Sequence, residues 1–270
     1  MIRNLWRSLE AVHAMIYFAP QAARRYTEAG LDRPGGYFAS RAAALGPVPA
    51  EVVIATFYNF NPELVRACVP AVWEKVTPAR MIELRTEAVE EALRPVLPED
   101  LTEITALARR AAERSAEMPF GRTLFAAHAS LPWPEDTLLQ LWHAQTLLRE
   151  FRGDGHLAAL LQEGLTGLEA LVLHAASGEV SGEALRKTRG WSQEQWAQTA
   201  EVLRERGLIT AEQALTDAGR ELRQRVEDNT DRMNAPAYDV LGDAERQRYV
   251  ELGAPLGKAV LEAGLLPGRR

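Results

Sequence analysis

The residues best able to do chemistry gather in one short polar stretch, REFRGDGH, at positions 149–156. It joins two apolar helical patterns. One interpretation is structural: a helix ends at Gly153, and Asp154 caps the helix that follows. The other is functional: Arg149 and a protonatable His156 beside a new helix N-terminus form a site for a ligand carboxylate or phosphate. Both interpretations predict a helix junction here.

The five histidines of the chain extend the functional interpretation. His13, His143 and His156 stand beside aromatic residues or turn signals, and the expected turn brings His156 back toward His143. His128 and His174 are expected to be core or helix-surface residues. Together with nearby aromatic and basic side chains, the predicted ligand-binding residues are His13, Tyr17, Arg41, Trp142, His143, Arg149, Asp154 and His156.

Metal binding and catalysis find little support in the sequence. Imidazoles with Asp154 suit a transition metal or a tetrapyrrole, but no HExxH or CxxC spacing is present, so metal and cofactor stay unassigned. Cys68 lies in the apolar stretch VRACVPAVW, which raises a thiol pKa and leaves it inert. No GxSxG, Walker or GxGxxG motif occurs. The sequence therefore assigns no catalytic residue.

Helical periodicity dominates residues 1–164, cut into short helices by proline and glycine. Two segments resemble each other, FASRAAALGPVP at 38–49 and FAAHASLPWP at 125–134. They reflect either an internal duplication or a coincidence among alanine-rich helices. In the suspected repeat Arg41 and His128 occupy matching places, which predicts that both line one cavity.

From residue 165 the pattern predicts three helices, a hairpin and a fourth helix. Trp196, Ala200 and Leu203 form the buried stripe of the third helix, and the hairpin strands are expected at 208–209 and around Leu215. This is the element order of a winged helix-turn-helix domain. Its helix stops and caps are Gly178, Gly190, Ser192 with Gln195 in a capping box, Gly207 and Thr216.

The segment RERGLI…LTDAGRELRQRV resembles the recognition helix, wing and long helix of MarR-type regulators, and the last segment resembles their C-terminal dimer helix. We expect Gly253 and Pro255 to break or kink that helix. YFA, LPWP, LWHAQTLLREFRGDGH and GLTGLEALVLHAA make the whole chain resemble an uncharacterised actinobacterial helix-turn-helix family. The resemblance implies the fold and a cytoplasmic location, but no substrate. The patterns along the chain predict a mainly α protein with a helical ligand-binding domain at 1–164, a MarR-like winged helix-turn-helix domain at 165–232, and a C-terminal segment at 233–270 as a candidate dimer contact.

DNA binding by this winged helix has arguments on both sides. The expected contacts are Arg186, Lys187, Arg189, Gln193, Gln195 and Gln198, because glutamines read adenine and cations bind phosphates. Against them, Glu194 and Glu201 share the exposed helix face, and the wing TAEQA holds no cation. Residues 183–225 contain eight Lys and Arg and seven Asp and Glu, so the positive and negative charges of this segment nearly cancel. The domain is thus either a DNA reader or a retained scaffold.

The composition bounds these hypotheses. A formal charge of −6 over 270 residues excludes a surface that is basic throughout, and a single cysteine excludes an internal disulfide. No apolar run has the length of a membrane span, so we expect a cytoplasmic protein without a membrane partner. The leading hypothesis is a ligand-responsive transcriptional regulator with double-stranded DNA and a small molecule as partners. The alternative is an enzyme or a ligand-, metal- or tetrapyrrole-binding protein whose winged helix is only a scaffold.

Overall fold

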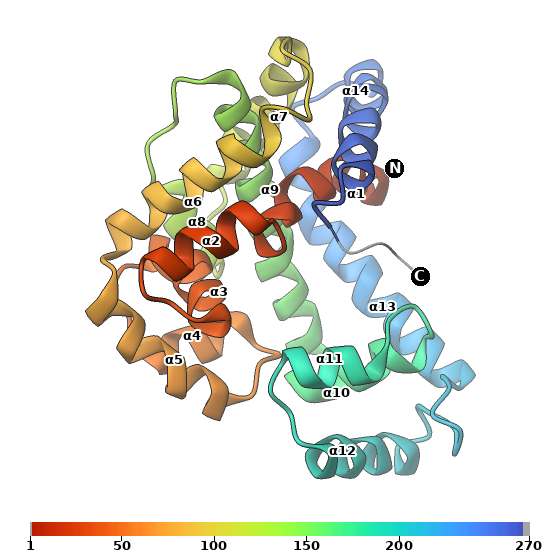
Figure 1. Cartoon of the computed structure of the whole chain (residues 1–270). Helices are drawn as coiled ribbons and strands as arrows, with labels where there is room; N and C mark the ends of the chain where they lie inside the picture. Colours follow the sequence, from red (N-terminus) through yellow and green to blue (C-terminus); the bar gives the residue numbers. More distant parts are fainter. Residues whose placement is uncertain (1, 267–270) are drawn as a thin grey trace. The chain divides into compact units, whose positions relative to one another are not determined.

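The computed structural model describes residues 2–266, and these form helices joined by short loops, without a β-strand among them (Figure 1). The mainly α fold expected from the periodicity is confirmed. The helices are α1 (Ile2–Ala14), η1 (Met15–Tyr17), α2 (Pro20–Glu28), α3 (Arg33–Ala42), η2 (Ala43–Leu45), α4 (Ala50–Phe57), α5 (Pro62–Lys75), α6 (Pro78–Leu93), α7 (Thr102–Ala116), α8 (Thr123–Ala129), α9 (Thr137–Gln162), α10 (Gly167–Ala176), α11 (Gly182–Thr188), α12 (Gln193–Glu205), α13 (Asp217–Asn234), η3 (Ala235–Tyr238) and α14 (Asp243–Glu262).

The contacts divide the chain into two compact units. Unit 1 comprises residues 1–48, 71–154 and 231–270, and unit 2 comprises residues 49–70 and 155–230. Both units are thus discontinuous in sequence, whereas the boundaries drawn from the sequence run consecutively along the chain. Those boundaries, at 1–164, 165–232 and 233–270, stay a prediction about independently folding parts.

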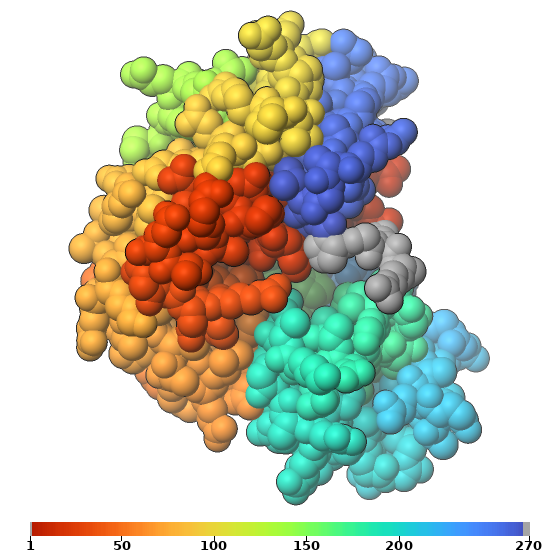
Figure 2. All heavy atoms as spheres, viewed as in Figure 1, coloured from red at the N-terminus to blue at the C-terminus, as the bar shows by residue number. Residues whose placement is uncertain are grey.

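Unit 1 is built around one large apolar core, to which α1, α6, α7, α9 and α14 contribute. Helices α1 and α14 pack closely because two glycines of α14 face α1. A Cβ at Gly253 would lie 2.9 Å from Leu9, and one at Gly257 would lie 2.8 Å from the carbonyl oxygen of Ser8. In Figure 2 the atoms of α2 (red) pack directly against those of α6 (golden), as the contacts between these helices require.

Unit 2 contains the helix-turn-helix that the sequence predicts. Helices α10, α11 and α12 pack together, and Gly190 in the turn between α11 and α12 adopts a φ of 75° that favours glycine. Ser192 and Gln195 form the expected capping box, with both hydrogen bonds at 3.0 Å. Trp196, Ala200 and Leu203 are the buried residues of α12. Helix stops, cap and stripe are therefore confirmed.

The helix junction expected at 149–156 is absent, because α9 runs unbroken from Thr137 to Gln162. A glycine costs a helix about 1 kcal/mol relative to alanine, and here tertiary contacts offset that cost. The carboxylate of Glu150 binds Arg41, and the guanidinium of Arg152 donates to Asp231 at 2.8 Å. Asp154 is not an N-cap either: its Oδ2 accepts the backbone N–H of Phe125 in α8 at 3.0 Å.

Two further expectations are corrected. Among the described residues the hairpin between α12 and α13 is reduced to a single antiparallel bridge, Ile209 to Leu215, flanked by the backbone hydrogen bonds from Thr210 to Ala214 and from Thr216 to Leu208. Helix α14 is not broken at Gly253 or Pro255, which both lie inside it, so of the expected break or kink the break is wrong and the kink stays a prediction. The internal duplication stays a prediction.

Within residues 2–266, no single helix combines the length and the apolar character that crossing a bilayer requires, although the bent pair 33–45 and 50–57 meets that test when taken together.

Candidate functional site

A cluster of arginines, histidines and aromatic residues lies inside unit 1 and is here called the arginine–histidine cluster. Helix α9 supplies one row of it, since Trp142, Thr146, Arg149 and Glu150 recur at helical spacing on one face. The other members come from α1, η1, α3, α6 and α8. The cluster consists of His13, Tyr17, Arg41, Arg85, His128, Trp142, His143, Thr146, Arg149 and Glu150.

His13 is completely buried, and both of its ring nitrogens have partners. The hydroxyl of Thr146 donates to the carbonyl oxygen of Trp142 at 3.0 Å, so it must accept from Nδ1 of His13, 3.1 Å away. Nε2 of His13 then accepts from the hydroxyl of Tyr17 at 3.1 Å. Burial lowers the pKa of His13 well below its ordinary value, helped by the charge of Arg149. His13 is therefore a neutral, fixed imidazole that orders its neighbours.

Two arginines of the cluster are neutralised by carboxylates. Arg41 donates to Glu150 through Nη2 at 2.9 Å and through Nε at 3.3 Å. Burial opposes the charge of Glu150, but Arg41 and then Arg149 hold its pKa at about 2. Arg149 donates to Glu10 at 3.0 Å and lies over the ring of Tyr17. These pairs balance two of the three arginine charges of the cluster.

Arg85 is the third cation, and it has no acidic partner among the described residues. It is only 3% exposed. Its Nη1 donates to the carbonyl oxygen of Ser40 at 2.8 Å, in the last turn of α3, and its Cζ lies 4.8 Å from the ring centre of Trp142. Its Nε and Nη2 have no hydrogen-bond partner within residues 2–266, and neither has Nε1 of Trp142. Arg85 is thus a buried charge with donors left over.

His128 and His143 have lowered pKa values and one unpartnered Nε2 each within the part of the chain that the structure describes. Burial, followed by the charge of Arg85, lowers the pKa of His128 to about 3 and that of His143 to about 4. Both imidazoles are therefore neutral near pH 7, each with one N–H and one acceptor nitrogen. The ring of His143 packs edge-on against Trp133, with centroids 4.8 Å apart.

The structure brings together six of the eight residues predicted for ligand binding: His13, Tyr17, Arg41, Trp142, His143 and Arg149. Asp154 belongs to the same unit but serves as a partner for α8. His156 belongs to unit 2, where Nδ1 lies 3.0 Å from the hydroxyl of Thr230. Because α9 is continuous, no turn leads His156 back toward His143.

Arg85, Glu150 and Thr146 were not predicted, and His128 was assigned to core or surface. A signal for Arg85 exists in the sequence: it occupies a core position of α6, between Met81 and Val89 at helical spacing. Charged residues are rarely buried at such a position unless paired. For His128 the signal was its place in the suspected repeat, since Arg41 and His128 do lie within electrostatic reach of each other.

The cluster does not resemble a metal centre. Among residues 2–266 no three His, Cys, Asp or Glu side chains come together to hold a metal ion. Three guanidinium groups around the imidazoles also disfavour a cation. A surface hollow of about 290 Å³ lies elsewhere in unit 1, near the start of α9, and its Arg94 and Asp136 already pair at 3.0 Å. The candidate site is therefore the arginine–histidine cluster, because it contains buried polar atoms without hydrogen-bond partners among the described residues. The described residues that line the surface hollow have no such atoms.

The residues predicted for DNA binding lie on α11, the turn and α12 of unit 2. Gln193 and Gln198 are exposed on α12, whereas the amide of Gln195 is engaged in the capping box. Nη1 of Arg186 donates to the carbonyl oxygen of Trp191 at 3.2 Å, and Lys187 pairs with Glu183 at 2.5 Å. The guanidinium of Arg189 lies 4.7 Å from the ring centre of Phe60.

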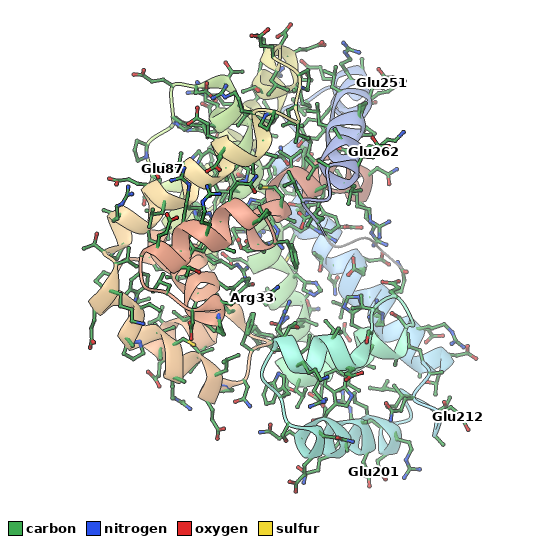
Figure 3. The ribbon with its side chains drawn as sticks, viewed as in Figure 1. Arg33, Glu87, Glu201, Glu212, Glu251 and Glu262 are labelled. Carbon is green, nitrogen blue, oxygen red and sulfur yellow. The ribbon has the colours of Figure 1, made fainter. Side chains whose placement is uncertain are left out.

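The charge of unit 2 is acidic. Its residues include nine Lys and Arg and fourteen Asp and Glu, a formal charge of −5. Figure 3 labels two of the exposed acids, Glu201 on α12 and Glu212 in the loop that follows. Glu201 pairs with Arg204, the cation near the end of α12. A DNA-binding surface here would depend on local cations.

A comparison with family models finds one match, described as a helix-turn-helix family, over residues 2–267. Comparisons with curated proteins and with solved structures find no match. The match covers nearly the whole chain, so it extends over both units and not only over the helix-turn-helix. The chain belongs to this helix-turn-helix family.

Proposed function

We propose that this protein binds a small molecule in the arginine–histidine cluster of unit 1 and contacts double-stranded DNA through α11 and α12 of unit 2, as a ligand-responsive regulator in the cytoplasm. The observation that carries the ligand-binding part is Arg85. A buried cation without a counter-charge is strongly destabilising, and proteins pair such charges or use them. The open atoms of Trp142, His128 and His143 lie in the same cluster.

The DNA-binding part rests on the family and on the geometry of α11 and α12. Gln193 and Gln198 face solvent on the helix that enters the major groove in such motifs. Arg186, Lys187 and Arg189 precede it on α11 and the turn, where phosphates lie in this docking mode. We further propose that the bridge Ile209–Leu215 is a shortened wing of the MarR type, and that residues 233–270 contribute a contact between two copies.

The acidic charge of unit 2 favours a second candidate function. In it the protein is an enzyme or a ligand-sequestering protein, and the helix-turn-helix serves only as a scaffold. Phosphate contacts release counterions, so DNA affinity must fall steeply with salt if the first proposal holds. The scaffold proposal expects no measurable DNA binding even at low salt.

The deciding experiment measures binding of the protein to its own upstream DNA by fluorescence anisotropy over a range of salt concentrations. We expect replacement of Arg186, Lys187 and Arg189 by Ala to weaken binding by about 1–3 kcal/mol in total and to flatten the salt dependence. A matched triple variant replaces Arg24, Arg80 and Arg94, which are exposed arginines of unit 1 paired with glutamates. Equal binding by both variants would remove α11 from the interface.

A further inference from the structure

The free donors of Arg85 lie on one edge of its guanidinium. In arginine, Nε–H and one N–H of Nη2 point the same way and form the two-donor edge that matches the two oxygens of a carboxylate. In Arg85 these are the two nitrogens without a partner among residues 2–266, whereas Nη1 is used by Ser40. Both donors of the edge that recognises a carboxylate, Nε and Nη2, are therefore available on Arg85.

Other arginines of this protein show what such an edge binds. Arg41 uses Nε and Nη2 to hold both oxygens of Glu150 inside the same cluster. At the surface, Arg248 uses the same two nitrogens to hold both oxygens of Glu103, at 2.8 and 2.7 Å. In both cases the partner is a carboxylate supplied by the chain. At Arg85 the described residues supply none.

The charge balance specifies a monoanion. Glu150 compensates Arg41 and Glu10 compensates Arg149, so a single positive charge is left inside the cluster. One carboxylate neutralises it, whereas a phosphate dianion would leave a buried negative charge in excess. Further hydrogen-bonding groups surround the edge: Nε1–H of Trp142 is a donor, and Nε2 of His128 and of His143 is a donor or an acceptor according to the tautomer.

We infer that the arginine–histidine cluster binds a small organic monocarboxylic acid, whose carboxylate takes two hydrogen bonds from Nε and Nη2 of Arg85 beside Trp142. This inference rests on the proposed ligand-binding function and names its chemical class. Most side chains of the cluster, Arg85 and Trp142 among them, are buried, so the acid must be compact. The smallest carboxylates are therefore the appropriate probes.

The test titrates the full chain with sodium formate, acetate and benzoate at constant ionic strength, with chloride as the balancing anion and phosphate as the competing oxyanion. The thermal unfolding midpoint and the tryptophan fluorescence are followed, because Trp142 lies against Arg85. We expect a saturable rise of the midpoint with at least one carboxylate. In the Arg85→Met variant the dissociation constant should rise on the order of tenfold or more, since two charge-assisted hydrogen bonds are lost.

Two further variants sharpen the result. Arg85→Lys keeps the charge but lacks the two-donor edge, so it should also bind weakly. Arg248→Met removes an edge of the same geometry at the surface and should bind like the wild type. Arg85→Met deletes a buried unpaired charge and is expected to fold, which circular dichroism checks. Retention of binding in Arg85→Lys would show that charge alone acts and would overturn the edge geometry.

Other results overturn the inference outright. Carboxylates that act no differently from chloride, or phosphate that binds where carboxylates do not, would exclude a monocarboxylate. If acetamide, titrated as a neutral analogue of acetate, stabilises the wild type and Arg85→Met equally, the carboxylate is overturned but ligand binding by unit 1 stays in place. If instead no compound of any charge stabilises the protein, the proposed function fails together with the inference.

Discussion

Burial and positive charge act in the same direction on the histidines of unit 1. Desolvation disfavours an imidazolium, and so do the guanidinium groups nearby. Arg85 contributes to the lowered pKa of all three, His13, His128 and His143. The cluster is thus held in one protonation state over the neutral pH range, with hydrogen-bonding groups whose charge does not change.

This arrangement predicts a pH-dependent loss of stability. A histidine that titrates at about 4 in the folded protein and near 6.5 when unfolded binds more protons in the unfolded state between these values. Stability is therefore complete above pH 6.5 and decreases as the pH falls toward 4. We expect His143→Phe, which cannot titrate, to lose about 2 kcal/mol less than the wild type between pH 6.5 and about 4.5.

The measurement is urea unfolding of both proteins across this pH range. Asp154 contributes with the opposite sign, because burial raises its pKa to about 6 and the folded state then binds more protons than the unfolded state. Its contribution is present in both proteins and cancels in the difference. Parallel stability curves for the two proteins would contradict the lowered pKa of His143.

At the level of the residue, the sequence shows which side chains have groups that could bind a ligand. It does not show which of their atoms lack a hydrogen-bond partner in the fold. His13 stacks on Trp142 as a member of the predicted group, yet its two ring nitrogens are already bound by Thr146 and Tyr17. Arg85 occupies a core position of α6, between Met81 and Val89, but that position alone does not show whether a partner binds it. Whether a donor finds a partner depends on residues far away in the chain, and periodicity carries no information about them.

At the level of the element, local signals were reliable and long-range ones were not. The capping box of α12 and the glycine after α12 involve residues within a turn of each other, so the sequence specifies them directly. The continuity of α9 is different. The glycines favour a break locally, and the helix persists because Glu150, Arg152 and Asp154 are each bound by other segments of unit 1.

The continuity of α9 predicts that Gly153→Ala is stabilising. A Cβ at this position would meet only Oε2 of Glu150, at an ordinary 3.5 Å, and alanine is the better helix former. We expect a gain of about 0.5–1 kcal/mol in the free energy of unfolding, measured by urea denaturation. A helix junction at this glycine would instead make the change destabilising.

The control for this prediction is Gly207→Ala. Gly207 adopts a φ of 70° after α12, and a Cβ there would meet no atom within 4 Å. A methyl group at this position would therefore clash with no neighbouring atom, and alanine is disfavoured only by the backbone conformation. We expect a loss of about 1 kcal/mol, in line with the cost of the left-handed conformation for residues other than glycine. Changes of opposite sign in the free energy of unfolding would show that Gly153 lies inside a helix and that Gly207 ends one.

At the level of the whole molecule, the two units differ in how they handle charge. Among the described residues of unit 1, Arg85 is a buried cation without a counter-charge. In unit 2 the surplus is negative, and the cations near α12 are held by acids or by backbone: Arg204 by Glu201, and Arg186 by Trp191. Both proposed ligands are anions, but the units meet them differently: Arg85 offers open donors in unit 1, whereas phosphates at α12 of unit 2 would have to compete with its own glutamates.

That competition gives the last prediction, which separates a DNA reader from a scaffold. Glu194 and Glu201 lie exposed on α12, where Glu194 accepts from Gln198 at 3.2 Å and Glu201 pairs with Arg204. If α12 meets DNA, replacing both with Gln removes two repulsive charges and frees Gln198 and Arg204 for contacts. Affinity for duplex DNA at low salt should then rise by about 1–2 kcal/mol, with a steeper salt dependence.

The matched control replaces Glu28 and Glu83 of unit 1, exposed glutamates paired with arginines. An equal rise in both double variants would mean that only the net charge matters, and no DNA binding in any of the proteins would leave the helix-turn-helix as a scaffold.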